Sequence, residues 1–257
     1  MKVIILAAGC GTRLRPHTNS MPKCMVELAN KPLLHHQIAT LRSVGLNDII
    51  VVGGHRANKI KGKNIKIVLN KDYKTTNMVS TLFCAEEYIL DNEDLIITYG
   101  DIVYEAKVLH SLIESKESIS VSIDKKWYEL WDIRMENPLL DAETLKLCNS
   151  KYIKEIGKTP KNIKEIEGQY MGLIKIKGSF IKEFKDAWHN LKYNDKHDKK
   201  NYENMYMTSF IQKFIDNGAR VEAAFTEGGW LEVDTTSDLN LYNDLYKKNK
   251  LSRLIKL

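Results

Sequence analysis

The chain has 257 residues, of which 43% are hydrophobic and 28% are charged, a composition typical of one large globular domain with a substantial core. No apolar run approaches the roughly 20 residues of a membrane-spanning helix, and Met1 and Lys2 lead into a strand instead of a secretory signal, so we expect a cytoplasmic protein with no membrane partner. The formal net charge of +6 would suit nucleic acid, but the lysines do not cluster. A small anionic substrate fits equally well, and we expect no nucleic-acid partner.

The first predicted element is a strand at residues 3–6, whose unbroken apolar run is typical of a parallel strand buried on both faces. It is followed by a loop of residues with almost no side chain: Ala7, Ala8, Gly9 and Gly11. Such a backbone can approach a ligand closely and offer amide donors to anionic oxygens. Arg13 and Lys23 come after the loop. A glycine pair after a strand is often only a turn, but together with two cations it predicts a phosphate site.

This loop differs from two common phosphate-binding loops. Leu14 stands where a dinucleotide fingerprint has its third glycine, and no G-x-x-x-x-G-K-(S/T) segment occurs. The stretch from residue 6 to residue 34, LAAGCGTRLRPHTNSMPKCMVELANKPLL, instead resembles the signature of the nucleotidyltransferase family that includes sugar-1-phosphate nucleotidylyltransferases and phosphocholine cytidylyltransferases. That signature reads L-A-A-G-x-G-(T/S)-R-L-x-P-x-T-x-x-x-P-K, followed by N-K-P-L-(L/I), and nearly every fixed position is met.

The resemblance implies roles for individual residues of the loop. In the family, the loop wraps a nucleoside triphosphate, an arginine contacts the terminal phosphates, and a lysine lies at the α-phosphate and the acceptor phosphate. The resemblance therefore gives the catalytic roles to Arg13 and Lys23. The nucleotide-binding positions that it implies in this stretch are Leu6, Ala7, Ala8, Gly9, Gly11 and Thr12.

An alternation of strands and helices follows the loop. Apolar residues recur at helical spacing from Leu34 to Val44, and Gly45 ends the pattern as a helix C-cap does. Residues 48–54 and 65–70 are predicted strands, joined by a short crossover rich in lysine and glycine. This order predicts an α/β fold with a doubly wound, mostly parallel, mixed sheet. It agrees with the Rossmann-like nucleotidyltransferase (GT-A-like) fold that the resemblance implies.

A helix is predicted from about Met78, with Asn77 placed to cap it. Capping alone can explain the asparagine. The resemblance offers a second interpretation, in which the nucleotide base lies against this turn and is bound by Asn77 and Ser80. The N-x-x-S pattern is similar to the base-contacting segment of phosphocholine cytidylyltransferases.

The predicted strand at residues 95–101 ends in Gly100 and Asp101, at the sheet edge where ligands gather in open α/β folds. A carboxylate at this place can merely cap the next helix. The resemblance instead matches Asp101 to the family's metal-binding aspartate and includes Gly100 among the nucleotide-binding residues.

Further strands are predicted in the middle of the chain. Residues 118–124 alternate as a strand, and residues 130–135 and 143–148 are expected to form shorter antiparallel strands. Residues 163–178 contain a long predicted strand and resemble the family segment that lines the acceptor pocket. Its candidate acceptor-binding residues are Gln169, Tyr170 and Gly172. A strand glycine allows close approach of a substrate but also marks a bulge, so both interpretations of Gly172 stay open.

The remaining elements are predicted from pattern alone. A polar loop is expected at residues 193–204, a helix at residues 205–218, a strand at residues 220–225 and a final helix at about residues 237–250.

A second acidic signal precedes the final helix. If residues 230–234 form a strand, the side chains of Trp230, Glu232 and Asp234 share one face. Two carboxylates on one face are costly to bury unless a cation holds them. The resemblance matches Asp234 to the family's second metal-binding aspartate, and Trp230 and Glu232 become candidates for binding the acceptor. A helix cap made by Thr235 and Asp238 is expected as well.

We expect a single nucleotidyltransferase domain over residues 1–257, with a nucleotide-binding half at 1–125, an acceptor-binding half at 126–235 and a C-terminal helix at 236–257. The resemblance implies a cytidylyltransferase with Mg²⁺ as cofactor. It would transfer CMP from CTP to the phosphate or phosphonate of a small amine-bearing acceptor, of the phosphoglutamine, phosphocholine or aminoethylphosphonate type, and release pyrophosphate. Such products imply a role in making precursors of capsule or surface polysaccharide.

Two other functions stay open at this point. One is a sugar-1-phosphate nucleotidylyltransferase that uses UTP or dTTP. The other is a nucleotide-sensing module without turnover, although retention of both cations and both aspartates argues against it.

Overall fold

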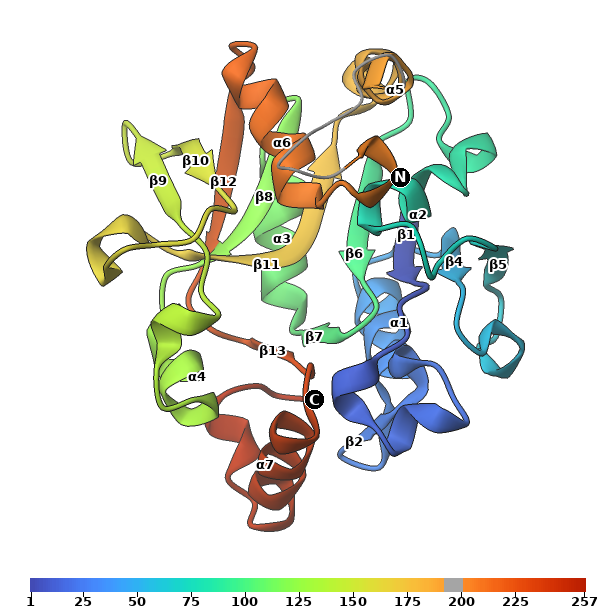
Figure 1. Cartoon of the computed structure of the whole chain (residues 1–257), viewed down its shortest axis with the longest axis vertical. Coiled ribbons are helices and arrows are strands. Elements are labelled where there is room, and N and C mark those ends of the chain that lie inside the picture. Colours follow the sequence, from blue (N-terminus) through green and yellow to red (C-terminus); the bar gives the residue numbers. More distant parts are fainter. Residues whose placement is uncertain (192–200) are drawn as a thin grey trace.

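The computed structural model describes residues 1–191 and 201–257. Its centre is a nine-stranded sheet with the spatial order β5-β4-β1-β6-β11-β8-β12-β10-β9 (Figure 1). The strands are β1 (Lys2–Ala7), β4 (Ile49–Gly53), β5 (Lys66–Leu69), β6 (Leu95–Tyr99), β8 (Ile119–Asp124), β9 (Leu145–Cys148), β10 (Tyr152–Ile156), β11 (Gln169–Ile176) and β12 (Val221–Thr226).

The sheet is mixed, and the predicted α/β fold class is confirmed. β1 pairs in parallel with β4 and β6, and β4 pairs in parallel with β5. β11 then runs antiparallel to both β6 and β8, β12 runs parallel to β8, and β10 and β9 complete the far edge as antiparallel strands. The doubly wound parallel unit therefore forms the N-terminal part of the sheet, and β1 is buried along its whole length, as its apolar run predicts.

Helices cover both faces of the sheet (Figure 1). One apolar core joins the sheet to α1 (Leu33–Ser43), α3 (Ala106–Glu114), α4 (Trp127–Arg134) and α7 (Thr236–Lys247). A second core, on the other face, joins it to α2 (Met78–Phe83), α5 (Ile181–Leu191) and α6 (Met207–Asp216). Alternate residues of β1 contribute to each core. The end of β1, and the loop that follows it, are therefore fixed from both sides.

Two short ribbons lie outside the main sheet. β7 (Ile102–Tyr104) pairs antiparallel with β13 (Trp230–Glu232), and β2 (Glu27–Leu28) pairs antiparallel with β3 (Lys31–Pro32). The β7/β13 ribbon is visible below the main sheet in Figure 1. It connects the chain just after β6 to the segment that leads into α7.

One sequence prediction of secondary structure is wrong. Residues 130–135 are predicted as a strand, but residues 130–134 belong to the helix α4, and Met135 is its C-cap. The buried residues of α4 are Trp127, Leu130 and Trp131, whose spacing places them on one face of a helix. A six-residue window is too short to separate this pattern from strand alternation. The neighbouring prediction at residues 143–148 is confirmed by β9, which pairs antiparallel with β10.

The predicted polar loop at residues 193–204 lies mostly outside the described residues, and Tyr202–Asn204 within it forms a short 3-10 helix. The helix predicted at residues 205–218 is confirmed as α6, and Gly218 follows it with a φ of 86°. The predicted C-terminal helix is α7, after which Leu251–Arg253 form a further 3-10 turn. Within residues 1–191 and 201–257, no helix has the length and apolarity needed to cross a membrane.

Candidate active site

The β7/β13 ribbon brings together two aspartates that are far apart in the chain. Ile102 pairs with Glu232, and the next backbone hydrogen bond runs from the Val233 amide to the Asp101 carbonyl at 3.0 Å. Asp101 precedes β7 and Asp234 follows β13, so both carboxylates lie at the same end of the ribbon. The structure therefore brings together the two residues that the sequence singles out as metal ligands.

Lys23 lies between these two carboxylates. It begins a 3-10 helix (Lys23–Met25), and its Nζ donates to Asp101 Oδ2 at 2.7 Å and to Asp234 Oδ1 at 2.8 Å. Burial alone would lower the pKa of the Lys23 ammonium, but the charges of Asp101 and Asp234 outweigh this effect and raise it above its ordinary value. Lys23 therefore stays protonated at neutral pH and forms a fixed cation at the centre of the site.

Arg13 contacts one of these carboxylates, that of Asp234, from the solvent side. It lies in a 3-10 helix (Thr12–Leu14), and its Nη1 is 2.6 Å from Asp234 Oδ2, while its side chain is 65% exposed. Asp234 is only 13% exposed and also pairs with Lys23, so it keeps a counter-ion if the guanidinium turns to a phosphate. The guanidinium fork suits a bidentate phosphate contact.

Two glycines, Gly11 and Gly100, allow the backbone to pack closely at the end of β1. Gly11 has a φ of 57°, and a Cβ there would lie 3.2 Å from Lys23 Cβ and 3.0 Å from Thr18 Cγ2. The Thr18 hydroxyl donates to the Gly11 carbonyl at 2.7 Å and closes the loop. A Cβ on Gly100 would lie 2.9 Å from the carbonyl oxygen of Leu6. Both glycines therefore set the path of the backbone at the end of β1.

A cavity of about 160 Å³, here called the nucleotide-side cavity, borders this loop. Its lining residues are Leu6, Ala8, Gly9, Tyr73, Thr76, Asn77, Met78, Thr81, Tyr99 and Asp101. Four of the predicted nucleotide-binding residues are thus brought together with a candidate metal ligand. Four others lie in the same loop and strand ends without lining the cavity: Ala7, Gly11, Thr12 and Gly100.

The two residues predicted to contact the base differ in their placement. Asn77 is the N-cap of α2, and its Oδ1 accepts from the Met78 amide at 2.9 Å, which confirms the expected cap. The residue also lines the nucleotide-side cavity. Ser80 does not, because its hydroxyl donates to the Glu203 carbonyl at 2.7 Å, away from the cavity.

The approach to α2 is ordered by Asn70, which sequence reasoning did not single out. Its buried Nδ2 donates to the hydroxyls of Thr76 and Thr81 at 3.0 and 2.9 Å, and its Oδ1 accepts from the Asp72 amide at 3.0 Å. Thr76 and Thr81 line the nucleotide-side cavity, so Asn70 fixes its wall from behind. An asparagine at the end of a strand carries no sequence signal that separates this role from an ordinary turn.

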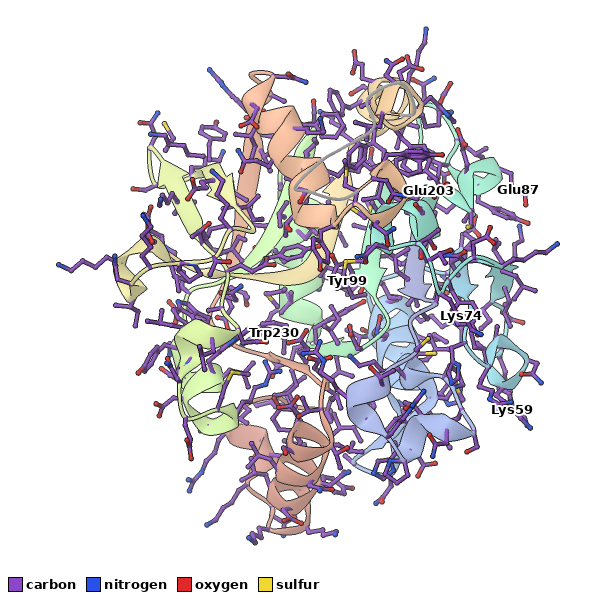
Figure 2. The ribbon with its side chains drawn as sticks, viewed as in Figure 1. Lys59, Lys74, Glu87, Tyr99, Glu203 and Trp230 are labelled. Carbon is purple, nitrogen blue, oxygen red and sulfur yellow. The ribbon has the colours of Figure 1, made fainter. Side chains whose placement is uncertain are left out.

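A second cavity of about 190 Å³, here called the acceptor-side cavity, adjoins the first. Its lining residues are Arg13, Met78, Tyr99, Ile102, Trp131, Asp141, Glu143, Gln169, Tyr170, Met171, Gly172, Tyr206, Thr208, Trp230, Glu232 and Asp234. All five predicted acceptor-binding residues are among them. Tyr99 and Met78 line both cavities, and Figure 2 shows Tyr99 near the middle of the molecule with Trp230 to one side.

Gly172 lies at a bulge, as one of its two interpretations expects. The register between β11 and β8 shifts between Tyr170 and Ile174, and the φ of Gly172 is 76°. A Cβ at this position would lie 2.7 Å from Cδ2 of Tyr99. The close approach that this glycine permits is therefore that of the Tyr99 ring, and the backbone of Gly172 still forms part of the cavity wall.

Two carboxylates that sequence analysis did not single out, Asp141 and Glu143, also line the acceptor-side cavity. Burial, and then the charge of Asp141, raise the pKa of Glu143 to about 7. Within the described part of the chain, no basic side chain forms an ion pair with Glu143. Asp141 accepts from Trp131 Nε1 at 3.1 Å. The cavity therefore offers carboxyl groups beside aromatic rings, and a bound cation would favour their ionised forms.

Glu232 differs from Glu143 because the protein supplies its counter-ion. Arg134, whose side chain is 1% exposed, lies 3.1 Å from Glu232 and also donates to both carboxylate oxygens of Asp238 at 3.0 and 3.3 Å. Burial raises the pKa of Glu232 above its ordinary value, and Arg134 opposes this only in part. Asp238 and Thr235 form a capping box at the start of α7, which confirms the expected cap.

The residues present fit a magnesium ion. Oδ1 of Asp101 is buried and, among the described residues, has no hydrogen-bond partner. No group of three or more His, Cys, Asp or Glu side chains in the described ranges could hold a metal. Mg²⁺ is commonly bound through one or two carboxylates together with substrate phosphates. A pair of aspartates with one free oxygen matches that donor set.

The sequence is similar to those of known proteins. Residues 3–142 match the family model described as the MobA-like NTP transferase domain. A CTP:phosphoglutamine cytidylyltransferase of Campylobacter jejuni is 44% identical over 250 residues, which cover 94% of this chain and 98% of that protein.

Two solved structures share the fold. The inositol-1-phosphate CTP transferase of T. maritima has a TM-score of 0.74 and 22% identity, with 100% of this chain and 98% of that chain covered. The CTP:phosphocholine cytidylyltransferase of Streptococcus pneumoniae has a TM-score of 0.70 and 19% identity, with coverage of 95% and 98%.

Proposed function

The chain belongs to the MobA-like NTP transferase family and is a nucleotidyltransferase, and from this premise we propose that it transfers CMP from CTP to a small phosphorylated acceptor that bears an amine. One observation carries the proposal. Asp101 lines the nucleotide-side cavity, Asp234 lines the acceptor-side cavity, and the Lys23 ammonium contacts both. A cation at the junction of two cavities lies where a phosphorus atom must be shared between two substrates.

In this reaction, an ionised oxygen of the acceptor phosphate or phosphonate forms a bond to the α-phosphorus of CTP. The bond from the α-phosphorus to the bridging oxygen breaks, and its electron pair leaves with pyrophosphate. No general base is needed, because the attacking oxygen already carries a negative charge. The protein's task is to position the reactants and to neutralise their charge.

The residues of the site divide this task. Lys23 acts as a point charge between the α-phosphate and the acceptor phosphate, and Arg13 holds the departing pyrophosphate through its guanidinium fork. Asp101 and Asp234 would hold Mg²⁺, which supplies further charge neutralisation on the phosphates. We propose that residues 1–125 bind the nucleotide and residues 126–235 the acceptor. The location of the two cavities supports this division.

An amine on the acceptor is supported by the charge of the acceptor-side cavity. Glu143 and Asp141 lie there beside Trp131, and within the described residues the only basic side chain that lines this cavity is Arg13. Phosphoglutamine is the acceptor named for the Campylobacter relative, and its ammonium group meets this requirement. We propose phosphoglutamine as the acceptor. The product would be a precursor of a surface polysaccharide, made in the cytoplasm, where nucleoside triphosphates are supplied.

Release of pyrophosphate from four nucleoside triphosphates, each paired with a panel of acceptors, tests the proposal. The panel contains phosphoglutamine, phosphocholine, aminoethylphosphonate and glucose-1-phosphate. We expect turnover with CTP and an amine-bearing acceptor. Preferred consumption of UTP or dTTP with glucose-1-phosphate would instead identify a sugar-1-phosphate nucleotidylyltransferase, and no turnover with any pair would contradict an enzymatic role.

A further inference from the structure

A buried aspartate that the proposed reaction does not use, Asp124, is the last residue of β8. It is 1% exposed, and three hydrogen bonds reach its carboxylate. Oδ1 accepts from the amides of Lys126 and Gly228, both at 2.8 Å, and Oδ2 accepts from the indole Nε1 of Trp230 at 2.8 Å. A buried carboxylate is costly unless its oxygens are satisfied, so these contacts hold one another in place.

The ring that Asp124 holds belongs to the wall of the acceptor-side cavity. Trp230 lines that cavity, and it also lines a further cavity of about 370 Å³ to which Asp124 contributes. Its ring centroid lies 6.0 Å from that of Trp131, with the two planes tilted by 46°. A ring that borders two cavities has fewer close contacts to fix its torsion angles. The hydrogen bond to Asp124 therefore supplies a directional constraint on the ring.

The same carboxylate also holds the backbone that leads into Trp230. Gly228 and Gly229 have φ values of 60° and 80°, so the turn before β13 has two consecutive residues in the left-handed region. The Gly228 amide donates to Asp124, and Asp124 pairs with Thr226 in the parallel register of β8 and β12. One carboxylate on the main sheet is thus attached to both the backbone just before Trp230 and the indole of that residue.

We infer that Asp124 is a positioning residue for the acceptor, which it serves by holding the Trp230 ring in the wall of the acceptor-side cavity. Asp124 does not itself line that cavity, so it acts through the ring. An aromatic face attracts a cation only when the two are correctly placed, and small displacements of a positioning group are costly. This inference rests on the proposed function for the identity of the acceptor, whereas the attachment of the ring can be measured without turnover.

Asp124→Asn removes the contact with the ring selectively. The Asn oxygen can still accept from the Lys126 and Gly228 amides, but the amide nitrogen carries two hydrogens and cannot accept from the indole. The matched control is Thr226→Val. The Thr226 hydroxyl donates to the Gly228 carbonyl at 3.1 Å, so this variant loses a hydrogen bond of the same turn and leaves the indole contact intact.

The kinetic test uses the acceptor of the panel that the parent turns over fastest. We expect Asp124→Asn to raise KM for this acceptor by about tenfold and to leave KM for CTP within about twofold. Thr226→Val is expected to leave both within about twofold. Trp230→Phe combined with Asp124→Asn should raise KM for the acceptor no further than Trp230→Phe alone, because Asp124 acts through the ring. Additive effects of the two substitutions would overturn the inference.

The spectroscopic test follows the indole protons in protein labelled with ¹⁵N-tryptophan. The chain has four tryptophans, and Trp230→Phe identifies the signal of Trp230 by its loss. We expect Asp124→Asn, but not Thr226→Val, to move this signal upfield, because the indole loses a charged hydrogen-bond acceptor. An unmoved signal would overturn the attachment. A moved signal with an unchanged KM for the acceptor would overturn the role of Asp124 in acceptor binding.

Titration of the labelled parent with phosphoglutamine separates this inference from the proposed function. Preferred turnover of UTP with glucose-1-phosphate would refute the proposed function, while the same split between the two KM values would still support the role of Asp124. In a parent without turnover, a Trp230 signal that shifts with phosphoglutamine would support the inference, and a signal that stays fixed would overturn it. The same titration decides the matter if Asp124→Asn does not fold.

Discussion

The Lys23 ammonium contacts the Asp101 carboxylate at 2.7 Å, although the two residues follow different strands of the sheet. Asp101 lines the nucleotide-side cavity, and Asp234, which lines the acceptor-side cavity, contacts the same ammonium at 2.8 Å. To reach a phosphate, Lys23 must share its donors between carboxylate and substrate.

Lys23→Ala is expected to lower kcat by about 100-fold or more, as is typical for loss of one strong donor to a transition state. Pyrophosphate release at saturating substrates measures the effect. Lys59→Ala, an exposed lysine that lines neither substrate cavity, is the control. A rate within about threefold of the parent for Lys23→Ala would remove this residue from the mechanism.

Asp101→Asn and Asp234→Asn are each expected to raise the Mg²⁺ concentration needed for half-maximal rate by about tenfold or more. Both carboxylates share the Lys23 cation and point to one place, so the loss of either should weaken a common metal site. Asp132→Asn, on an exposed position of α4, provides the control. If only one of the two aspartates changes the magnesium dependence, the two-carboxylate site is wrong.

Glu143→Gln is expected to raise KM for an amine-bearing acceptor by about tenfold while leaving KM for CTP nearly unchanged, because a charge-assisted contact is lost on the acceptor side alone. The pKa of Glu143 is raised to about 7, so its charge develops as pH rises through that value. KM of the parent for the acceptor should therefore fall by up to about tenfold between pH 6 and pH 8. In Glu143→Gln, KM for the acceptor should change less between pH 6 and pH 8 than it does in the parent. Glu136→Gln is the control, and the same pH profile in both variants would contradict the assignment.

Ionisation of Glu143 should lower the free energy of unfolding as pH rises. The pKa of Glu143 in the folded chain, about 7, lies above the ordinary value of 4.5, so the folded state binds more protons between these values and stability falls as pH rises through that window. Glu143→Gln should therefore unfold at nearly the same temperature as the parent near pH 4.5, and about 3 °C or more above it at pH 8. Thermal unfolding followed by circular dichroism measures both. A difference that does not depend on pH would show that the charge of Glu143 is compensated.

Arg134→Ala is expected to lower the free energy of unfolding by about 3 to 5 kcal/mol, because it leaves Glu232 and the buried Asp238 without a counter-ion. Denaturant titration gives the value. Lys247→Ala, which removes only an exposed contact to Asp244 at 3.8 Å, should change it by less than about 0.5 kcal/mol. Equal effects of the two substitutions would show that the buried network contributes no more than a surface pair.

The sequence carries much of this site because the signature fixes both residue type and spacing. The run after β1 indicates Arg13 and Lys23, and the residues at the ends of two later strands indicate Asp101 and Asp234. The direct contact of Lys23 with both carboxylates could not be predicted, because it depends on the β7/β13 pairing between segments distant in the chain. Alternation in the sequence places Glu232 and Asp234 on one face but does not identify the partner strand.

Other features lacked any local signal. Asp141 lies between the two strands predicted at residues 130–135 and 143–148, and Glu143 begins the second of them. The pattern alone therefore did not indicate that either residue approaches the acceptor-side cavity. Arg134 is a buried cation on a helix, and its partner Asp238 was recognised only as a cap. In each case the function depends on tertiary proximity.

The β7/β13 ribbon also limits how this protein can vary. Only three residue pairs set the alignment of its two strands, and a slip of one position would turn Glu232 and Asp234 to the opposite side. Loops that border the acceptor can change length without disturbing this alignment, whereas an insertion or deletion between Trp230 and Asp234 would separate the acids at once. We therefore expect relatives that use new acceptors to differ in the surrounding loops, while the lengths of β7 and β13 stay constant.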